Sequence, residues 1–171
     1  MVYLREITEG DLKVINKHRS DKELITSLVT PFRYINNETD DKWFQSYQNN
    51  RNNNIRCVIC TKESDEVVGV AYLLNIDWIT KSAEFGIFIG ELNYRGKGIG
   101  KKATIEMLQH GFNDMNLNRI QIRVLENNIP AINLYNKMGF KEEGLLREAI
   151  FKNNEYHNLI IMSILKQEFK Y

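Results

Sequence analysis

The most informative stretch of the chain is Asn93-Tyr94-Arg95-Gly96-Lys97-Gly98-Ile99-Gly100-Lys101-Lys102, which intersperses glycines with basic residues. An apolar alternation typical of a strand precedes it, and apolar residues at the spacing of a helix face follow it. Glycines let the backbone approach a ligand closely, and free N–H groups at the start of a helix favour an anion. The stretch therefore predicts a phosphate-binding loop that opens a helix near Lys97.

Two common phosphate-binding motifs do not match this loop. A Walker A motif requires glycine five residues before Gly100 and serine or threonine after Lys101, where the chain has Arg95 and Lys102. A dinucleotide-binding G-x-G-x-x-G motif would place its last glycine one residue after Gly100. A basic turn that only caps a helix therefore stays an alternative on this stretch alone.

Composition predicts one domain over residues 1–171. With 171 residues, 43% of them hydrophobic, the chain can bury a substantial core. A net charge of +1 gives no electrostatic reason to expect nucleic acid or an anionic membrane as partner. The first residues carry charge where a signal peptide is apolar, and no run approaches the roughly 18 apolar residues that span a bilayer. We therefore expect a soluble, cytoplasmic protein.

Cys57 and Cys60 form a C-x-x-C pair, which in other settings indicates zinc or redox chemistry. Here they lie in a strand-like run, where an offset of three sends side chains to opposite faces. We therefore predict two ordinary, reduced strand cysteines and no metal site.

The first half of the chain contains several expected elements. Asp11 is predicted to be the N-cap of a first helix, and a second helix is predicted to open at Thr39 and to contain Trp43. Trp43 would line an acceptor pocket, although packing against the sheet is an equally simple role. Expected strands are Val2–Ile7, Ile55–Cys60, Val67–Leu74 and Glu84–Ile89.

A second motif follows a strand-like run at Arg119–Leu125. It reads Asn128-Ile129-Pro130-Ala131-Ile132-Asn133-Leu134-Tyr135-Asn136-Lys137-Met138-Gly139-Phe140. Pro130 near its start and Gly139 near its end bound a short helix. The remaining alternation predicts a closing hairpin with strands at Glu143–Phe151 and Tyr156–Leu165.

Both motifs resemble those of the Gcn5-related N-acetyltransferases (GNAT). The loop matches the family's pyrophosphate pattern Arg/Gln-x-x-Gly-x-Gly/Ala, and the second motif matches Asn-x-x-Ala-Ile-x-Leu-Tyr-x-Lys-x-Gly-Phe. The likeness covers nearly the whole chain and is nearest to RimJ/RimL-like N-terminal acetyltransferases and spermidine N-acetyltransferases. It also rests on three shorter phrases: Leu4-Arg5 with Gly10-Asp11-Leu12, Lys81-Ser82-Ala83-Glu84-Phe85, and Phe140-Lys141-Glu142-Glu143-Gly144-Leu145.

The resemblance implies an α/β (α+β) GNAT fold. In such a fold a twisted mixed sheet of about six to seven strands is flanked by about four helices. Two central parallel strands splay apart, and here these would be Glu84–Ile89 and Arg119–Leu125.

The resemblance also implies acetyl-CoA as cosubstrate and no metal. Backbone groups of Phe88 and Ile89 would bind the pantetheine arm, and Asn128, Asn133 and Tyr135 would border the cofactor. The pyrophosphate would bind to the loop residues Arg95, Gly96, Lys97, Gly98, Ile99, Gly100 and Lys101.

Acyl transfer to an amine needs a group that accepts a proton and a group that supplies one. Tyr135 occupies the family's acid position, and a phenol can protonate a departing thiolate. Glu84 is the candidate base, directly or through water, or else a carboxylate that only holds the ammonium. Simple packing of Tyr135 and a surface position for Glu84 are the alternatives. Some relatives carry the base on the later strand, where this chain has Arg123.

The sequence predicts the type of reaction but leaves the identity of the acceptor amine open. Arg33, Tyr34, Trp43 and Glu84 are the predicted substrate-binding residues. The segment around Arg33 has no carboxylate, which weakens a polyamine acceptor, although Glu38, Asp40 and Asp41 could compensate.

Other acceptors and partners remain open. Arg33, Arg51 or Arg147 could bind the phosphates of a nucleotide-linked amino sugar, and a protein N-terminus is a third acceptor. A CoA-binding regulatory module is the non-enzymatic alternative. The expected partner is a small-molecule amine rather than nucleic acid or a membrane, and a homodimer or larger homo-oligomer is left open.

Overall fold

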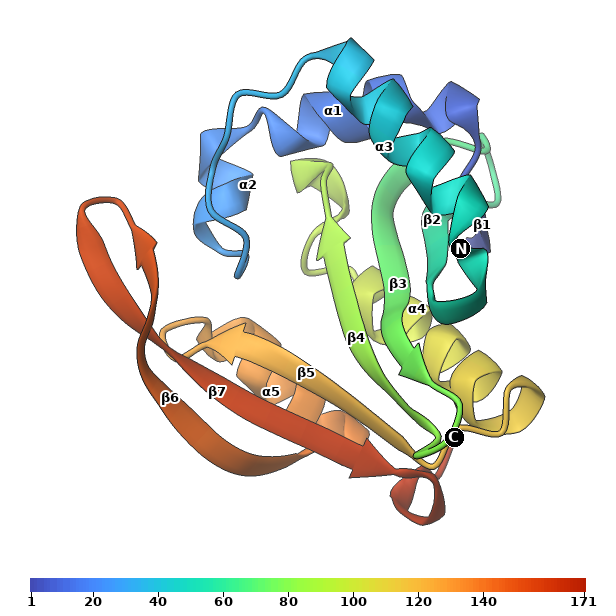
Figure 1. The fold of residues 1–171 in the computed structure, drawn as a ribbon, viewed down its shortest axis with the longest axis vertical. Helices are drawn as coiled ribbons and strands as arrows, with labels where there is room; N and C mark the ends of the chain where they lie inside the picture. Colours follow the sequence, from blue (N-terminus) through green and yellow to red (C-terminus); the bar gives the residue numbers. More distant parts are fainter.

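A single mixed sheet of seven strands forms the centre of the molecule, in the order β1-β2-β3-β4-β5-β7-β6 (Figure 1). The structure is a computed structural model and describes residues 1–171. The strands are β1 (Val2–Glu6), β2 (Ile55–Thr61), β3 (Val67–Asp77), β4 (Ser82–Ile89), β5 (Arg119–Leu125), β6 (Lys141–Lys152) and β7 (Glu155–Leu165). The predicted GNAT-type fold is confirmed.

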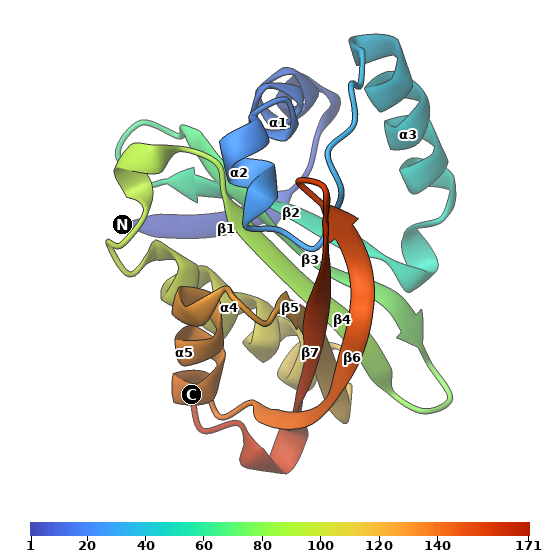
Figure 2. The same ribbon diagram turned by 90° about the vertical axis from the view of Figure 1, so that its left-hand side faces the viewer.

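Helices cover both faces of the sheet (Figure 2). One face carries α1, α2 and α3, and the other carries α4 and α5. The helices are α1 (Leu12–Arg19), α2 (Lys22–Thr26), α3 (Asn37–Asn49), α4 (Ile99–Gln109) and α5 (Ile129–Met138). None of them is both long and apolar enough to span a membrane.

Each face of the sheet has its own apolar core, and β2 contributes to both. Ile59 and Cys57 pack into the core beneath α4 and α5, whereas Val58 and Cys60 pack into the core beneath α1 and α3. The two cysteines therefore point to opposite faces, as predicted. Both are free thiols, and burial raises the pKa of Cys57 to about 11.

The two central parallel strands separate after a short pairing. β4 and β5 are in register only at Ser82–Arg119, Ala83–Ile120 and Glu84–Gln121. Beyond Glu84, β4 stays paired with β3 as far as Ile89, while β5 follows β7 (Figure 1). The edge of β4 that faces β5 is left without a strand partner, which confirms the predicted splay.

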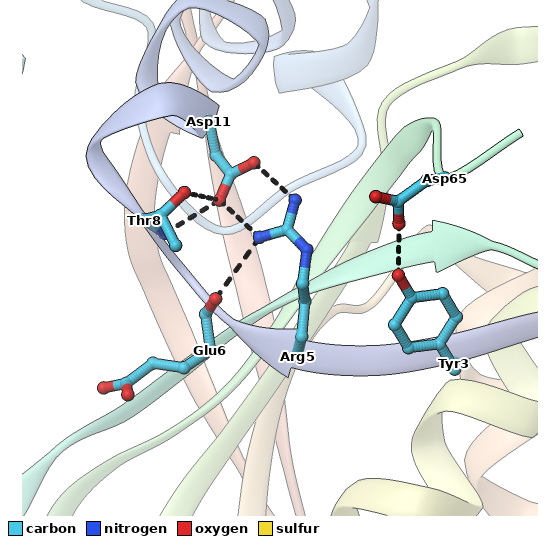
Figure 3. A network of polar contacts seen from close by, with 6 residues as sticks. All are labelled: Tyr3, Arg5, Glu6, Thr8, Asp11 and Asp65. Carbon is cyan, nitrogen blue, oxygen red and sulfur yellow. Dashed lines mark hydrogen bonds and ion pairs between the residues drawn. The ribbon is translucent and has the colours of Figure 1, made fainter.

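A polar network fixes the connection between β1 and α1 (Figure 3). Arg5 forms two hydrogen bonds of 2.8 Å with the carboxylate of Asp11. Thr8 donates its backbone N–H and its hydroxyl to the same carboxylate. Burial alone would raise the pKa of Asp11, but the hydrogen bonds from Arg5 and Thr8 lower it overall. Asp11 does precede α1, but its side chain does not cap α1 because it turns back to Thr8 and Arg5.

The predicted closing hairpin is also present. β6 and β7 pair antiparallel, and the tip of the hairpin reaches α2 on the other side of the sheet's central gap (Figures 1 and 2). The buried ammonium of Lys152 donates to the carbonyl oxygens of Ile25 and Leu28 at this contact. The hairpin is therefore fastened to the segment that ends α2.

Candidate active site

A cavity of about 450 Å³ occupies the region where β4 and β5 diverge. Its walls come from both faces of the sheet, with Arg19 of α1 and Trp43 of α3 on one side and Tyr135 of α5 on the other. This volume lies in the ordinary range for small-molecule sites, about 300–1,000 Å³. The splayed strands thus leave a passage through the sheet rather than a closed core.

Tyr135 faces this cavity from α5. Its ring lies edge-on to Phe85, with centroids 6.5 Å apart, and 5.5 Å from Phe140. The residue is 5% exposed. The hydroxyl of Tyr135 makes no hydrogen bond within the protein. It is nevertheless accessible to solvent, because Nδ1 of His18 is the only side-chain polar atom that is both inaccessible and without a partner. Burial, with the nearby phenol of Tyr72 as a smaller cause, raises the pKa of Tyr135, so the phenol stays protonated at neutral pH.

Glu84 enters the cavity from β4. Its Oε2 accepts a hydrogen bond of 3.1 Å from the guanidinium of Arg123 on β5. The two residues therefore bridge the point at which the strands begin to separate. A carboxylate held in this way stays available to a cationic ligand, because its other oxygen has no partner in the protein.

The loop before α4 exposes a run of backbone donors. The N–H groups of residues 96–101 have no acceptor within the protein. Gly96 and Gly98 adopt φ angles of +72° and +77°, which favour glycine, and a Cβ at either position would meet nothing within 4 Å. Convergent free N–H groups in front of open space form a site suited to a phosphate.

Basic side chains surround this loop. The Nε of Arg95 donates to the carbonyl of Ile89 at 3.1 Å and so ties the loop to the end of β4. The ammonium groups of Lys97 and Lys101 lie 5.7 and 5.8 Å from the rings of Tyr94 and Tyr171. α4 begins at Ile99 rather than near the predicted Lys97, because the left-handed Gly98 is its N-cap.

The other predicted cofactor residues differ in their positions and local contacts. Phe88 lines the cavity, and Ile89 follows it at the end of β4. Asn128 caps α5 by accepting from Ala131 at 3.2 Å, and its amide donates to the carbonyl of Ser27 at 2.9 Å. Asn133 is exposed on α5.

The predicted acceptor residues do not all meet. Trp43 and Glu84 line the cavity. Arg33 and Tyr34 do not: both are exposed, and Tyr34 packs edge-on against Phe32, with ring centroids 5.1 Å apart. The loop that carries them contributes residues 27–30 to the cavity wall, but its continuation at Arg33 and Tyr34 lies outside the wall.

Several cavity residues were not predicted from the sequence, and two of them, Arg56 and Tyr72, matter for the chemistry. Arg56 of β2 is in register with Tyr72 of β3, and Tyr72 is in register with Gly86 of β4. The Tyr72 ring lies over Gly86 so closely that a Cβ there would sit 2.1 Å from the ring. Their signal in the sequence is only strand alternation, which does not say which strands are neighbours. A large residue opposite a glycine would have been the clue once the sheet order was known.

The site can therefore bind an anion at the loop and carry out proton transfer in the cavity. One carboxylate and one phenol approach the passage from opposite sides of the sheet. No group of three or more histidine, cysteine, aspartate or glutamate side chains lies close enough together to hold a metal ion.

Comparisons with known proteins fit this geometry. The family model "Acetyltransferase (GNAT) domain" matches residues 2–141. The uncharacterized N-acetyltransferase p20 of Bacillus licheniformis is 32% identical over 167 residues, which cover 97% of this chain and 93% of that protein. The spermidine N(1)-acetyltransferase of Vibrio cholerae is 29% identical over 168 residues, covering 97% and 94%. A crystal structure of the Vibrio cholerae spermidine N-acetyltransferase with CoA and spermine superposes with a TM-score of 0.92 at 28% identity, covering 98% of this chain and 96% of that one.

Proposed function

The chain belongs to the GNAT acetyltransferase family, and from this premise we propose that it transfers the acetyl group of acetyl-CoA directly to a primary amine of a small molecule. The observation that carries the proposal is the passage between β4 and β5, which Glu84 enters from one face of the sheet and Tyr135 from the other. A direct transfer needs both reactants to meet in one place, and the walls of this cavity come from elements on both faces of the sheet.

The loop residues fit the pyrophosphate of acetyl-CoA. The free N–H groups of residues 96–101 would donate to its oxygens, and Lys97 and Lys101 would add positive charge. The unpaired edge of β4 at Phe88 and Ile89 offers backbone groups to the amides of the pantetheine arm. Acetyl-CoA itself supplies an acetyl group activated as a thioester.

The remaining chemistry falls to two side chains. At neutral pH an alkylamine with a pKa near ~10.4 is almost entirely protonated, so it must lose a proton before it attacks. The Glu84 carboxylate attracts the ammonium and accepts this proton, directly or through water. As the C–N bond forms and the C–S bond breaks, the Tyr135 hydroxyl donates its proton to the departing thiolate. The new amide nitrogen loses its second proton to solvent, Glu84 passes its proton to solvent, and solvent reprotonates the phenol. The products are the N-acetylated amine, CoA and one released proton.

The setting of the reaction follows from the same features. We place the protein in the cytoplasm, where the free thiols of Cys57 and Cys60 would stay reduced. We also treat residues 1–171 as one catalytic domain, because strands from both ends of the chain share one sheet.

The decisive experiment is a screen of acetyl-CoA consumption, in which the reaction is monitored through the release of the free CoA thiol. Polyamines belong in it because the Vibrio cholerae relatives are named for spermidine, together with amino sugars, aminoglycosides, amino acids and short peptides. We expect one class of amine to raise thiol release above background hydrolysis and to yield an N-acetylated product by mass spectrometry. Tight acetyl-CoA binding without turnover of any amine would instead indicate a regulatory CoA-binding module.

A further inference from the structure

Arg56 is the one charged side chain of the cavity that has no charged partner. Its guanidinium lies among three aromatic rings, 5.0 Å from the centroid of Trp43, 6.0 Å from Tyr47 and 5.6 Å from Tyr72. Cation–π contacts of this kind are electrostatically favourable. They hold the side chain in one place but satisfy none of its N–H groups.

The guanidinium of Arg56 also has no hydrogen-bond acceptor in the protein. The hydrogen bonds of this residue all run through its backbone, with Tyr47 on one side and Ile7 on the other. An arginine side chain carries five N–H donors, and burying a charge without a partner is costly. Burial lowers the pKa of Arg56, which is the mark of that cost. None of these donors is sealed from solvent, and Arg56 is one of the residues that line the cavity.

The other charges of the cavity wall are already paired. Arg19 binds the carboxylate of Asp40 behind the wall, and Arg123 binds Glu84. Glu84 is the only carboxylate among the lining residues, whereas Arg19, Arg56 and Arg123 are all positive. The wall thus has an excess of positive charge, which disfavours a polycation.

Arg56 lies on the same face of the sheet as Glu84, the candidate base. Arg56, Tyr72 and Gly86 are in register across three strands, and Glu84 is two residues from Gly86 on the same face. The two backbone positions are separated by two strand spacings, about 10 Å, and by two residues along the strand, about 7 Å, and both side chains line the same cavity. A molecule that reaches both side chains would therefore carry its amine and its anion at opposite ends.

We propose that the acceptor of this enzyme is a small primary amine that also carries an oxyanion, a carboxylate or a phosphate, which Arg56 binds while Glu84 holds the amine. The inference rests on the proposed function and specifies its substrate class. Arginine suits the task because its planar fork matches the oxygens of either anion. Trp43, Tyr47 and Tyr72 would hold the guanidinium in position before the acceptor arrives.

The test compares acceptors that differ only in the anion. The carboxylate arm sets α-amino acids and ω-amino acids of increasing length against the alkylamines that lack the carboxylate. The phosphate arm sets O-phosphoethanolamine and 3-aminopropyl phosphate against ethanolamine and 3-aminopropanol, and spermidine serves as the polycation. We expect kcat/KM to be at least 10-fold higher for the anionic member of the best pair, and the arm that wins identifies the anion.

Variants then assign the preference to Arg56. Arg56→Met keeps a long side chain among the rings but removes the charge, so KM for the anionic acceptor should rise about 10²-fold while KM for acetyl-CoA stays unchanged. The preference over the neutral partner should disappear in this variant and return in part in Arg56→Lys. Lys13→Met is the matched control, because it removes one positive charge from an exposed site of α1 that does not line the cavity.

A binding measurement separates this inference from the proposed function. The anionic amines are titrated calorimetrically into CoA-saturated wild type and Arg56→Met, and only wild type should bind them. Turnover of spermidine or neutral amines without turnover or binding of any anionic amine would overturn the inference and leave the acetyltransferase standing. Turnover of no amine would overturn the proposed function, and the calorimetric comparison would then decide whether Arg56 binds an oxyanion. Equal anion preference in wild type and Arg56→Met would also overturn the inference.

Discussion

Tyr135 combines a buried ring with a free hydroxyl, and these two parts of the side chain have different roles. The ring packs against Phe85 and Phe140, while the hydroxyl has no partner in the protein. Removing the oxygen alone should therefore leave the core intact. Burial raises the pKa of the phenol, so its proton is present at neutral pH.

Tyr135→Phe should lower kcat by about 10²- to 10⁴-fold, the usual effect of losing a general acid. Stability and acetyl-CoA affinity should change little, and the loss should shrink with an acyl donor whose leaving group is a weaker base. Steady-state kinetics with saturating acceptor measure the effect, with Tyr3→Phe as a control that loses a hydroxyl outside the cavity. Equal turnover with rate-limiting chemistry would make Tyr135 a packing residue only.

Glu84→Gln should depress acetylation at neutral pH and leave acetyl-CoA binding nearly intact. If the carboxylate helps deprotonation, activity should partly recover as the pH rises, because bulk solvent then supplies neutral amine. The unfolding free energy should change by no more than about 1 kcal/mol, since the pair with Arg123 is partly exposed. Glu142→Gln on the exposed face of β6 is the control. Full activity of Glu84→Gln at pH 7 would exclude a role in the reaction.

At the scale of elements, the loop before α4 needs glycine for its left-handed backbone and open space in front of it for the ligand. Gly98→Asp should raise the dissociation constant for acetyl-CoA by at least about 10²-fold, because it puts a negative charge where the phosphates would lie. Gly98→Asn is the matched control, since it has nearly the same size and tolerates a left-handed backbone almost as well. Isothermal titration of both folded variants makes the comparison, and an equal loss of affinity would point to bulk or strain rather than to charge.

Elements whose ends are marked by their own residues, such as capping residues, could be predicted from the sequence. Elements that depend on contacts with distant parts of the chain could not. α5 carries its own boundaries, with Asn128 as N-cap, Pro130 in the first turn and Gly139 at φ +96° after the end. α2 has five residues, too few for an apolar period, and was missed. The strands flanking the gap were placed to within two residues.

The candidate site divides in the same way. Tyr135 and Glu84 stand within motifs, so their meeting at one cavity could be anticipated. Arg56 and Tyr72 could not, because a strand sequence does not state its neighbours or its register. Arg33 was expected at the acceptor, but a loop residue points wherever its loop is held, and this loop lines the cavity with residues 27–30 and not with Arg33.

At the scale of the whole molecule, Lys152 links parts of the chain that are 124 and 127 residues apart in the sequence. Burial lowers the pKa of its amine to about 8. The folded value lies below the ordinary one, so the unfolded state binds more protons between pH 8 and about 10.5, and stability should rise with pH across this window.

Lys152→Met should lose about 1–3 kcal/mol of unfolding free energy at pH 7.5, because two carbonyls lose their donor. The wild type should then gain a further 1–2 kcal/mol or so over the variant by pH 9.5. Urea unfolding at both pH values measures the difference, and the variant cancels the titration of all other groups. A gap that does not widen with pH would show that Lys152 is not the titrating group.

The three residue pairs that join β4 to β5 have a mechanical consequence. Every other pair of neighbouring strands is in register over five to eight residues, so tension in the plane of the sheet should be resisted least along this line. A protease that unfolds its substrates by pulling on them would therefore separate the sheet most easily between β4 and β5. Acetyl-CoA bound across the gap should join the two halves of the sheet and so raise the resistance to unfolding along this line.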